Sequence, residues 1–356
     1  MQMRKLGHSG LDVSAYGLGV MTFGGQTGEA DAMRQMDMAF EAGVTLFDTA
    51  ENYPTPISAE TQGRSEELLG KWIAARKIRD KVVIATKVAG PGNAAGDMAH
   101  IRGPMRHLDA ANIALAVDDS LRRLGTDHID LYQVHWPERA VSTHGRQRFS
   151  QLSDATGQVS IEETLAALAS HIAAGKIRAI GLCNETPWGV MRYLFMADLS
   201  SLPRVASIQN GYSLLDRQFE IGLAEVAMRE EVGLIGYSPL AGGTLTGKYD
   251  VGKNGGAPAP IAGSRSEGSP TFVARLLSPA RQQAIAAYGA IAREHGLDPA
   301  QMALAFAAQQ PFMASVLMAA SRAEQLAGNL GAVGVTLPKD VVSAINAVHD
   351  ARPNPK

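Results

Sequence analysis

The sequence contains very little cysteine and no long apolar run. Cys183 is the only cysteine among 356 residues, which excludes an intramolecular disulfide bond and fits a reducing compartment. No stretch approaches the roughly 18 consecutive apolar residues that a membrane helix needs. The segment at residues 1–8 lacks the apolar core of a signal peptide. We therefore expect a cytoplasmic protein that has no membrane partner.

An excess of charge of one sign is also lacking. Lys and Arg number 33, Asp and Glu number 35, and the formal net charge is -2. Proteins that bind nucleic acids usually carry a basic patch or stripe, and the sequence has no such cluster. The HExxH and Cys/His patterns typical of zinc sites are absent as well. We therefore expect no nucleic-acid partner and no metal, and an anionic cofactor would need a local pocket.

The sequence does contain a regular alternation of strand-like and helix-like segments. Short apolar runs of strand length are separated by stretches of helical periodicity. These eight runs occupy residues 15–19, 44–48, 82–86, 129–134, 177–182, 205–209, 233–237 and 315–318. Eight parallel strands joined by helices close most readily into a (β/α)8 TIM barrel. We predict one such α/β domain over residues 1–356.

The ends of the segments support this prediction. Four helical stretches are followed by glycine, which closes a helix most easily in a left-handed conformation: Gly43, Gly125, Gly175 and Gly296. Residues 1–13, with a turn at 7–10, predict an N-terminal β-hairpin that caps the barrel floor, and residues 351–356 form a tail. A doubly wound open sheet is the alternative. It requires a third glycine in the turn at 17–22, where Thr22 stands instead.

Polar residues with complementary chemistry stand at or after the ends of three runs. Asp48 and Tyr53 follow the second run, Lys87 the third and His135 the fourth. Reactive residues of TIM barrels gather at the carboxyl ends of the strands. Reduction of a carbonyl needs a proton donor for the developing alkoxide, and Tyr53 can fill this role if its pKa of about 10 is lowered. We expect Lys87 to lower it, Asp48 to hold the Lys87 ammonium, and His135 to orient the carbonyl.

Three connections are longer than the short loops usual in such folds: residues 90–108, 137–158 and 239–278. Loops of this length usually carry function, and we expect a substrate rim and a cofactor clasp on the C-terminal face. The third loop contains GGTLTGKY at 242–249, which matches a P-loop at seven of eight positions. Tyr249 stands where a P-loop needs Ser or Thr for magnesium, so we do not expect a nucleotide hydrolase.

Several short segments together resemble the signatures of the aldo-keto reductases in order and spacing. They are DTAENY (48–53), ATKV (85–88), VHWP (134–137), GLCNE (181–185), SIQN (207–210), YSPL (237–240), GTLTGKY (243–249) and QLAGN (325–329). The match extends over nearly the whole chain and is most similar to the bacterial Tas-type NADP(H)-dependent reductases. The resemblance implies NADPH-dependent reduction of aldehydes and ketones. It also implies that Asp48, Tyr53, Lys87 and His135 form the catalytic tetrad.

The resemblance assigns further residues to the nicotinamide half of the cofactor. It implies that Asn184 and Gln209 bind the carboxamide, since a buried amide needs polar partners. It also implies that Tyr237 stacks on the nicotinamide ring. The segment after the seventh strand would lie over the pyrophosphate, and its predicted contacts are Ser238, Leu240, Gly242 and Lys248.

A helix after the eighth strand would bind the other half of the cofactor. Ser321 and Glu324 have the spacing of a capping box, and a helix N-terminus there would direct backbone N–H groups at a phosphate. Arg322 would add a forked charge for the 2′-phosphate and so favour NADPH over NADH. Gln325 and Asn329 match family positions near the adenosine.

The substrate is a small carbonyl compound in this interpretation. Trp136 and Phe23 would give the mouth an aromatic wall suited to apolar carbonyls, although both are also compatible with ordinary barrel packing. The sequence indicates neither a particular substrate nor an oligomeric state. Two other functions fit the same residues. One is an NADP(H)-binding, redox-responsive regulatory subunit with little turnover, similar to the potassium-channel β-subunits. The other is a barrel lyase that forms a Schiff base through Lys87.

Overall fold

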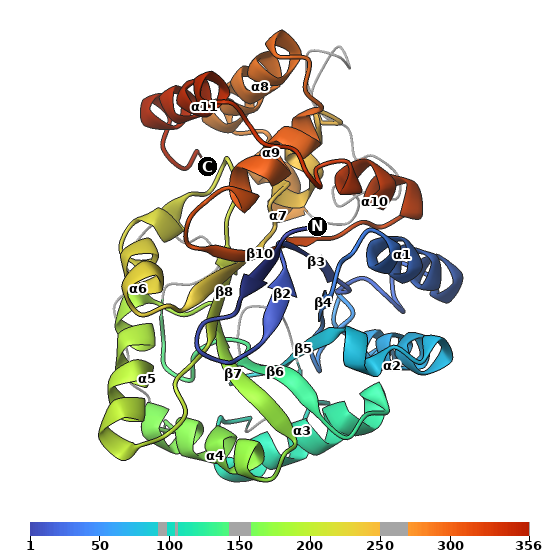
Figure 1. The fold of residues 1–356 in the computed structure, drawn as a ribbon, viewed down its shortest axis with the longest axis vertical. Helices are drawn as coiled ribbons and strands as arrows, with labels where there is room; N and C mark the ends of the chain where they lie inside the picture. The colour runs from blue at the N-terminus through green and yellow to red at the C-terminus, as the bar shows by residue number, and fades with distance from the viewer. Residues whose placement is uncertain (92–97, 104–105, 142–157, 250–269, 356) are drawn as a thin grey trace.

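A closed barrel of eight parallel strands occupies the centre of the computed structural model (Figure 1). The structure describes residues 1–91, 98–103, 106–141, 158–249 and 270–355. Neighbouring strands follow the order β10-β3-β4-β5-β6-β7-β8-β9. Their bounds are β3 (Tyr16–Gly19), β4 (Leu46–Asp48), β5 (Val83–Val88), β6 (Ile129–Val134), β7 (Ile177–Cys183), β8 (Ser207–Gly211), β9 (Gly233–Tyr237) and β10 (Met313–Met318). Each predicted run contributes one strand, and the predicted TIM barrel is confirmed.

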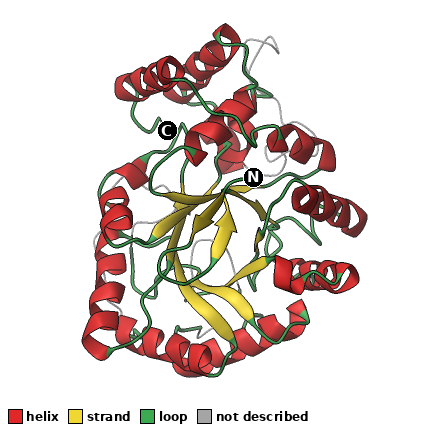
Figure 2. Ribbon diagram, in the orientation of Figure 1, coloured by secondary structure: helices red, strands yellow, loops and turns green. Residues whose placement is uncertain are grey.

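Helices cover the outside of the barrel (Figure 2). They are α1 (Glu29–Glu41), α2 (Arg64–Arg76), α3 (Ala110–Leu124), α4 (Ile161–Ala173), α5 (Pro187–Ser200), α6 (Leu223–Arg229), α7 (Pro270–Leu276), α8 (Pro279–Glu294), α9 (Pro299–Ala308), α10 (Ala323–Leu330) and α11 (Lys339–Ala351), with 3-10 turns η1 (Arg79–Lys81), η2 (Gln218–Glu220) and η3 (Ala241–Thr246). Gly43, Gly125, Gly175 and Gly296 all have positive φ, as predicted. Within the described residues, no helix combines the length and apolar character needed to cross a bilayer.

The N-terminal residues form the predicted hairpin and close the floor of the barrel. Strand β1 (Met3–Lys5) pairs antiparallel with β2 (Asp12–Ser14). Leu6 and Val13 are completely buried and pack in one cluster with barrel residues such as Leu131. The guanidinium of Arg4 donates to the carbonyl of Met313 at 2.8 Å, which ties the hairpin to the start of β10. The apolar end of the barrel interior is therefore sealed from solvent.

The barrel interior changes from apolar to polar along the strands. Alternate residues of a barrel strand point inward. Ala85 on β5 and Leu131 on β6 belong to the apolar cluster near the floor. Two residues further along are Lys87 and Gln133, both completely buried. Because every second residue of a strand points inward, the polar side chains of Lys87 and Gln133 form the layer of the barrel interior nearest its C-terminal mouth.

Gly70 allows α2 to approach α3 closely. A Cβ on Gly70 would stand 2.5 Å from the carbonyl carbon of Leu124 and closer still to its oxygen. Backbone atoms cannot rotate away as a side chain can, so the helices would have to separate. We expect Gly70→Ala to lower the free energy of unfolding by about 1–3 kcal/mol, measured by urea denaturation.

A glycine elsewhere supplies the control for this substitution. A Cβ on Gly289 in α8 would meet only the flexible guanidinium of Arg293. Because Ala favours helix over Gly by about 1 kcal/mol, Gly289→Ala should be neutral or stabilising. Equal stability of the Gly70→Ala variant and the parent protein would show that α2 and α3 separate without cost.

Candidate active site

Lys87 and Asp48 form a buried ion pair at the carboxyl ends of adjacent strands. The Nζ of Lys87 donates to Oδ2 of Asp48 at 2.6 Å and to the carbonyl of Thr49 at 2.7 Å. The side chains of Lys87 and Asp48 are 0% and 4% exposed. Strand pairing aligns Asp48 with Ala85, so the inward side chain two residues beyond Ala85 reaches the carboxylate. The backbone register alone brings this pair together.

Tyr53 and His135 lie beside this ion pair. The hydroxyl of Tyr53 is 3.4 Å from Nε2 of His135, and their rings meet edge to face. The ammonium of Lys87 lies 5.1 Å from the centre of the Tyr53 ring. Tyr53 comes from the loop after β4, and its N–H donates to the carbonyl of Ala50. All four residues predicted for the tetrad therefore converge at one place.

The pKa values at this place differ from the expectation for a phenol next to an ammonium. Burial is the largest effect and raises the pKa of Tyr53 to about 12; the charge of Lys87 lowers this pKa, and the charge of Asp48 raises it by less than Lys87 lowers it. Lys87 thus acts in the predicted direction, but burial outweighs it and the net shift is upward. Burial is the largest single effect and lowers the pKa of Lys87, but the charges of Asp48, Tyr53 and Cys183 and the hydrogen bond to Asp48 together raise it, so the net shift is upward. At neutral pH the phenol is protonated and the ammonium is charged.

The second oxygen of Asp48 accepts from two buried amides. Gln133 Nε2 donates to Oδ1 of Asp48 at 3.0 Å, and Gln209 Nε2 donates to the same atom at 2.8 Å. The prediction did not include Gln133. A signal for it exists, because Gln133 precedes His135 by two residues and so lies on the same inward face of β6. A polar residue at such a buried position needs a partner.

The residues predicted for the nicotinamide lie directly against the tetrad. The amide nitrogen of Asn184 donates to the carbonyl of His135 at 2.9 Å, and its oxygen accepts from the Tyr237 hydroxyl at 2.8 Å. The thiol of Cys183 lies 3.7 Å from Oε1 of Gln209. Burial raises the pKa of Cys183 to about 12, so this thiol is protonated and is not a nucleophile.

The glycine-rich segment after β9 has an unusual backbone. Ser238, Ala241, Gly242 and Gly243 have φ values of 57°, 49°, 71° and 86°. The N–H groups of Ala241 and Gly243 donate within the segment, to the carbonyls of Ser238 and Leu240. The segment forms η3 instead of the long helix that follows a P-loop. Leu240, which lies between these positions, packs partly against the core.

Helix α10 begins one residue later than the predicted capping box requires. Its N-cap is Arg322, whose own side chain does not cap the helix; the N–H of Ala323 donates instead to Oδ1 of Asp31 in α1 at 3.3 Å. The backbone N–H and the hydroxyl of Ser321 lie 3.2 and 3.1 Å from Oε1 of Gln325, while Glu324 pairs with Arg34 of α1. The predicted Ser321–Glu324 box is wrong, because Ser321 lies outside the first helical turn.

Three further residues predicted for the cofactor differ in exposure. Lys248 is exposed, and its Nζ lies 5.0 Å above the ring of Tyr249. Arg322 is exposed, and its guanidinium has no hydrogen bond or ion pair with any described residue. Asn329 is buried in α10. Arg322 is thus available to a ligand at the N-terminus of this helix.

Trp136 and Phe23, which were predicted either to form an aromatic wall or to pack in the barrel, are both buried. Trp136 packs 4.8 Å from the His135 ring and donates from Nε1 to the carbonyl of Pro91. Phe23 is completely buried in the main hydrophobic core, so the prediction that it lines the mouth is wrong. Much of the three long loops falls at 92–97, 104–105, 142–157 and 250–269, outside the described residues. The predicted substrate rim and cofactor clasp remain predictions.

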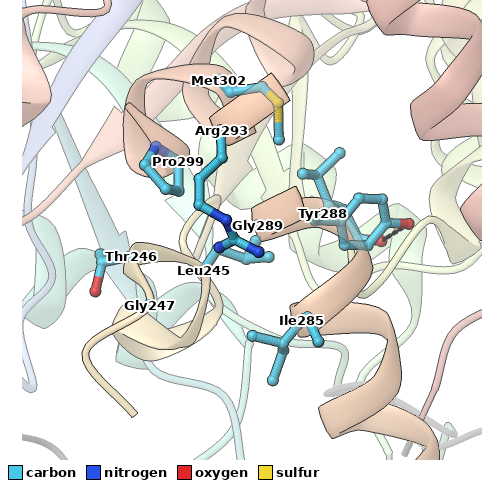
Figure 3. A pocket seen from close by; sticks show the side chains of 11 residues that line it. Leu245, Thr246, Gly247, Ile285, Tyr288, Gly289, Arg293, Pro299 and Met302 are labelled. Atoms are coloured by element: carbon cyan, nitrogen blue, oxygen red, sulfur yellow. Dashed lines mark hydrogen bonds between the residues drawn. The ribbon is translucent and has the colours of Figure 1, made fainter. Parts of the chain in front are cut away.

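A separate crevice lies between η3, α8 and α9 (Figure 3). Its volume is about 50 Å³, and its lining includes Leu245, Ile285, Tyr288 and Arg293. None of the residues predicted for the tetrad or the cofactor lines this crevice. It is therefore distinct from the cluster around Lys87.

Known proteins share this sequence pattern. The model described as "Aldo/keto reductase family" matches residues 15–350. The chain belongs to the aldo/keto reductase family. It is 50% identical to Protein tas of Escherichia coli strain K12 over 349 residues, which are 98% of each chain. It is 30% identical to the L-glyceraldehyde 3-phosphate reductase of the same strain over 342 residues, 94% of this chain and 88% of that protein.

A third relative agrees with this placement. The Uncharacterized oxidoreductase YrpG of Bacillus subtilis strain 168 is 32% identical over 351 residues, 98% of this chain and 96% of that protein. The resemblance to Tas-type aldo-keto reductases that the short motifs indicated is confirmed. This aldo/keto reductase is accordingly an oxidoreductase, and its family membership implies NADP-dependent carbonyl reduction.

Proposed function

We propose that this aldo/keto reductase reduces aldehydes or ketones to alcohols with NADPH and that Tyr53 donates the proton. One observation carries the proposal: the Tyr53 hydroxyl lies 3.4 Å from His135 Nε2, beside the buried Lys87–Asp48 pair. An acid, an imidazole and a buried ammonium are the groups that a developing alkoxide requires.

The residues of this chain fit a dinucleotide phosphate. The exposed ammonium of Lys248 suits the pyrophosphate, and the exposed guanidinium of Arg322 suits the 2′-phosphate. The buried amides of Asn184 and Gln209 suit the carboxamide. Polar groups for both ends of NADPH are therefore present on one side of the barrel.

The charged groups around Tyr53 favour transfer of its hydroxyl proton to the substrate. NADPH supplies the hydride to the carbonyl carbon. The Tyr53 hydroxyl gives its proton to the carbonyl oxygen, and the phenolate that remains is stabilised by the Lys87 ammonium. Asp48 keeps that ammonium charged, and His135 directs the carbonyl oxygen toward Tyr53. Because the pKa of Tyr53 is about 12, the acid is fully protonated before each turnover.

Two measurements test this function together. Fluorescence titration with NADPH and NADH gives both affinities, and a panel of aldehydes and ketones then reports turnover. We expect tight NADPH binding and reduction of at least one carbonyl class. Cofactor binding without turnover would favour a regulatory subunit. Borohydride trapping of a substrate on Lys87 would favour a lyase, which the raised pKa of Lys87 argues against.

The preference for NADPH should depend on Arg322. We expect Arg322→Ala to weaken NADPH binding by about 10-fold or more, because a guanidinium–phosphate contact is lost, and to leave NADH binding unchanged. Arg229→Ala removes an exposed cation from α6, where Arg229 pairs with Glu225, and serves as the control. An equal loss of affinity for both cofactors would place Arg322 away from the 2′-phosphate.

A further inference from the structure

Gln133 lies at the centre of the polar layer, yet no step of the proposed reaction uses it. Its side chain is completely buried on β6, where strand pairing aligns it with Lys87. Its Nε2 donates to Asp48 Oδ1 at 3.0 Å, and its Oε1 accepts from Gln209 Nε2 at 3.2 Å. Gln133 thus joins the partner of Lys87 to a residue assigned to the cofactor.

The carboxylate determines the orientation of both amides. An ionised Asp48 can only accept hydrogen bonds, so Gln133 and Gln209 must each direct an N–H toward it. The other N–H of Gln209 is taken by the oxygen of Gln133. Both donors of Gln209 are therefore engaged. Its Oε1 has only the weak thiol donor of Cys183, at 3.7 Å, among the described residues.

We propose that Gln133 is a positioning residue: it orients the Asp48 carboxylate toward Lys87 and holds the Gln209 amide with its oxygen available as an acceptor. This inference rests on the proposed function, because the acceptor would serve the amino group of the nicotinamide carboxamide. Without Gln133, one N–H donor of Gln209 would be unpaired. The side-chain amide of Gln209 could then flip, which would exchange the positions of its oxygen and nitrogen. A purely structural glutamine would change stability but neither cofactor affinity nor the pH profile.

Two substitutions of Gln133 separate these roles. Gln133→Met keeps the length and approximate volume and removes both hydrogen bonds. We expect kcat to fall about 10- to 100-fold and the Kd for NADPH to rise about 10-fold, because each lost bond involves a charged or buried partner. Ser207→Ala is the control, since this hydroxyl of β8 is completely buried and has no partner in the described part of the chain. It should behave like the parent protein.

Gln133→Glu adds a readout that a structural role would not show. Above its pKa the introduced carboxylate repels Asp48, whereas at lower pH one proton shared between the two carboxyls restores the hydrogen bond. We expect kcat and NADPH affinity of this variant to recover as the pH falls. The parent protein and Gln133→Met should show no such recovery. If Gln133→Met folds poorly, the pH profile of Gln133→Glu still tests the positioning role of Gln133.

Parent-like kcat, NADPH affinity and pH profiles in both Gln133 variants would overturn the proposal, even if their melting temperatures fell. The proposed function fails by a different result. If the parent protein binds NADPH but reduces no carbonyl, that function is wrong, while the NADPH titration still decides the effect of Gln133 on Gln209. If the parent protein binds no NADPH, both are wrong.

Discussion

Tyr53→Phe should lower kcat for carbonyl reduction by about 100- to 10,000-fold and leave the Kd for NADPH unchanged. The substitution removes only the hydroxyl that lies 3.4 Å from His135 Nε2. The ring would still pack beside Lys87, so the shape of the site would be kept. Single-turnover absorbance of NADPH measures the chemical step, and fluorescence titration measures binding.

Tyr288→Phe is a matched control for the loss of a hydroxyl. The Tyr288 hydroxyl donates to the carbonyl of Leu214 next to the separate crevice, and its loss should not change kcat. If Tyr53→Phe reduced carbonyls at the parent rate, Tyr53 would not be the proton donor. If its NADPH affinity fell in parallel with kcat, Tyr53 would act mainly in binding.

Lys87→Met should lower the free energy of unfolding by about 3–5 kcal/mol, because it leaves the Asp48 carboxylate buried without its partner. Turnover should fall as well, since no ammonium would stabilise the Tyr53 phenolate. Urea denaturation measures the stability. Lys176→Met breaks the exposed pair with Asp118 and should cost about 1 kcal/mol or less.

A second variant distinguishes stability from catalysis at this pair. Asp48→Asn in the Lys87→Met background removes the unpaired charge while keeping a polar group for Gln133 and Gln209. We expect it to regain much of the lost stability but none of the lost turnover. If the Lys87→Met variant alone were as stable as the parent protein, leaving the Asp48 carboxylate without its partner would cost no free energy of unfolding.

Much of the fold was predictable because its signals are local. Eight apolar runs of strand length, separated by helical periodicity and closed by glycines such as Gly43 and Gly125, are sufficient for a parallel barrel. The strand ends then determine which face Asp48, Lys87 and His135 share. The N-terminal hairpin follows in the same way from a short turn between two extended segments.

The predictions from sequence were wrong where the outcome depends on the exact starting residue of a helix or on the packing around a side chain. Helix α10 begins at Ala323, which leaves Ser321 outside the first turn and Glu324 paired with Arg34. Phe23 is an aromatic residue near a strand end, but the core encloses it completely. Gln133 was missed although its position two residues before His135 places it on the inward face of β6; its two partners, Asp48 and Gln209, come from other strands and are visible only in the fold.

The amino-acid order of this aldo/keto reductase was enough to specify a TIM barrel, because periodicity and turn residues act over short distances along the chain. It was also enough to indicate four polar groups at the barrel mouth. The protonation of those groups was decided by folding. Burial of Tyr53 and the nearness of Asp48 together outweigh Lys87, since the energy of a charge depends on the solvent and charges around it, which segments distant in sequence supply.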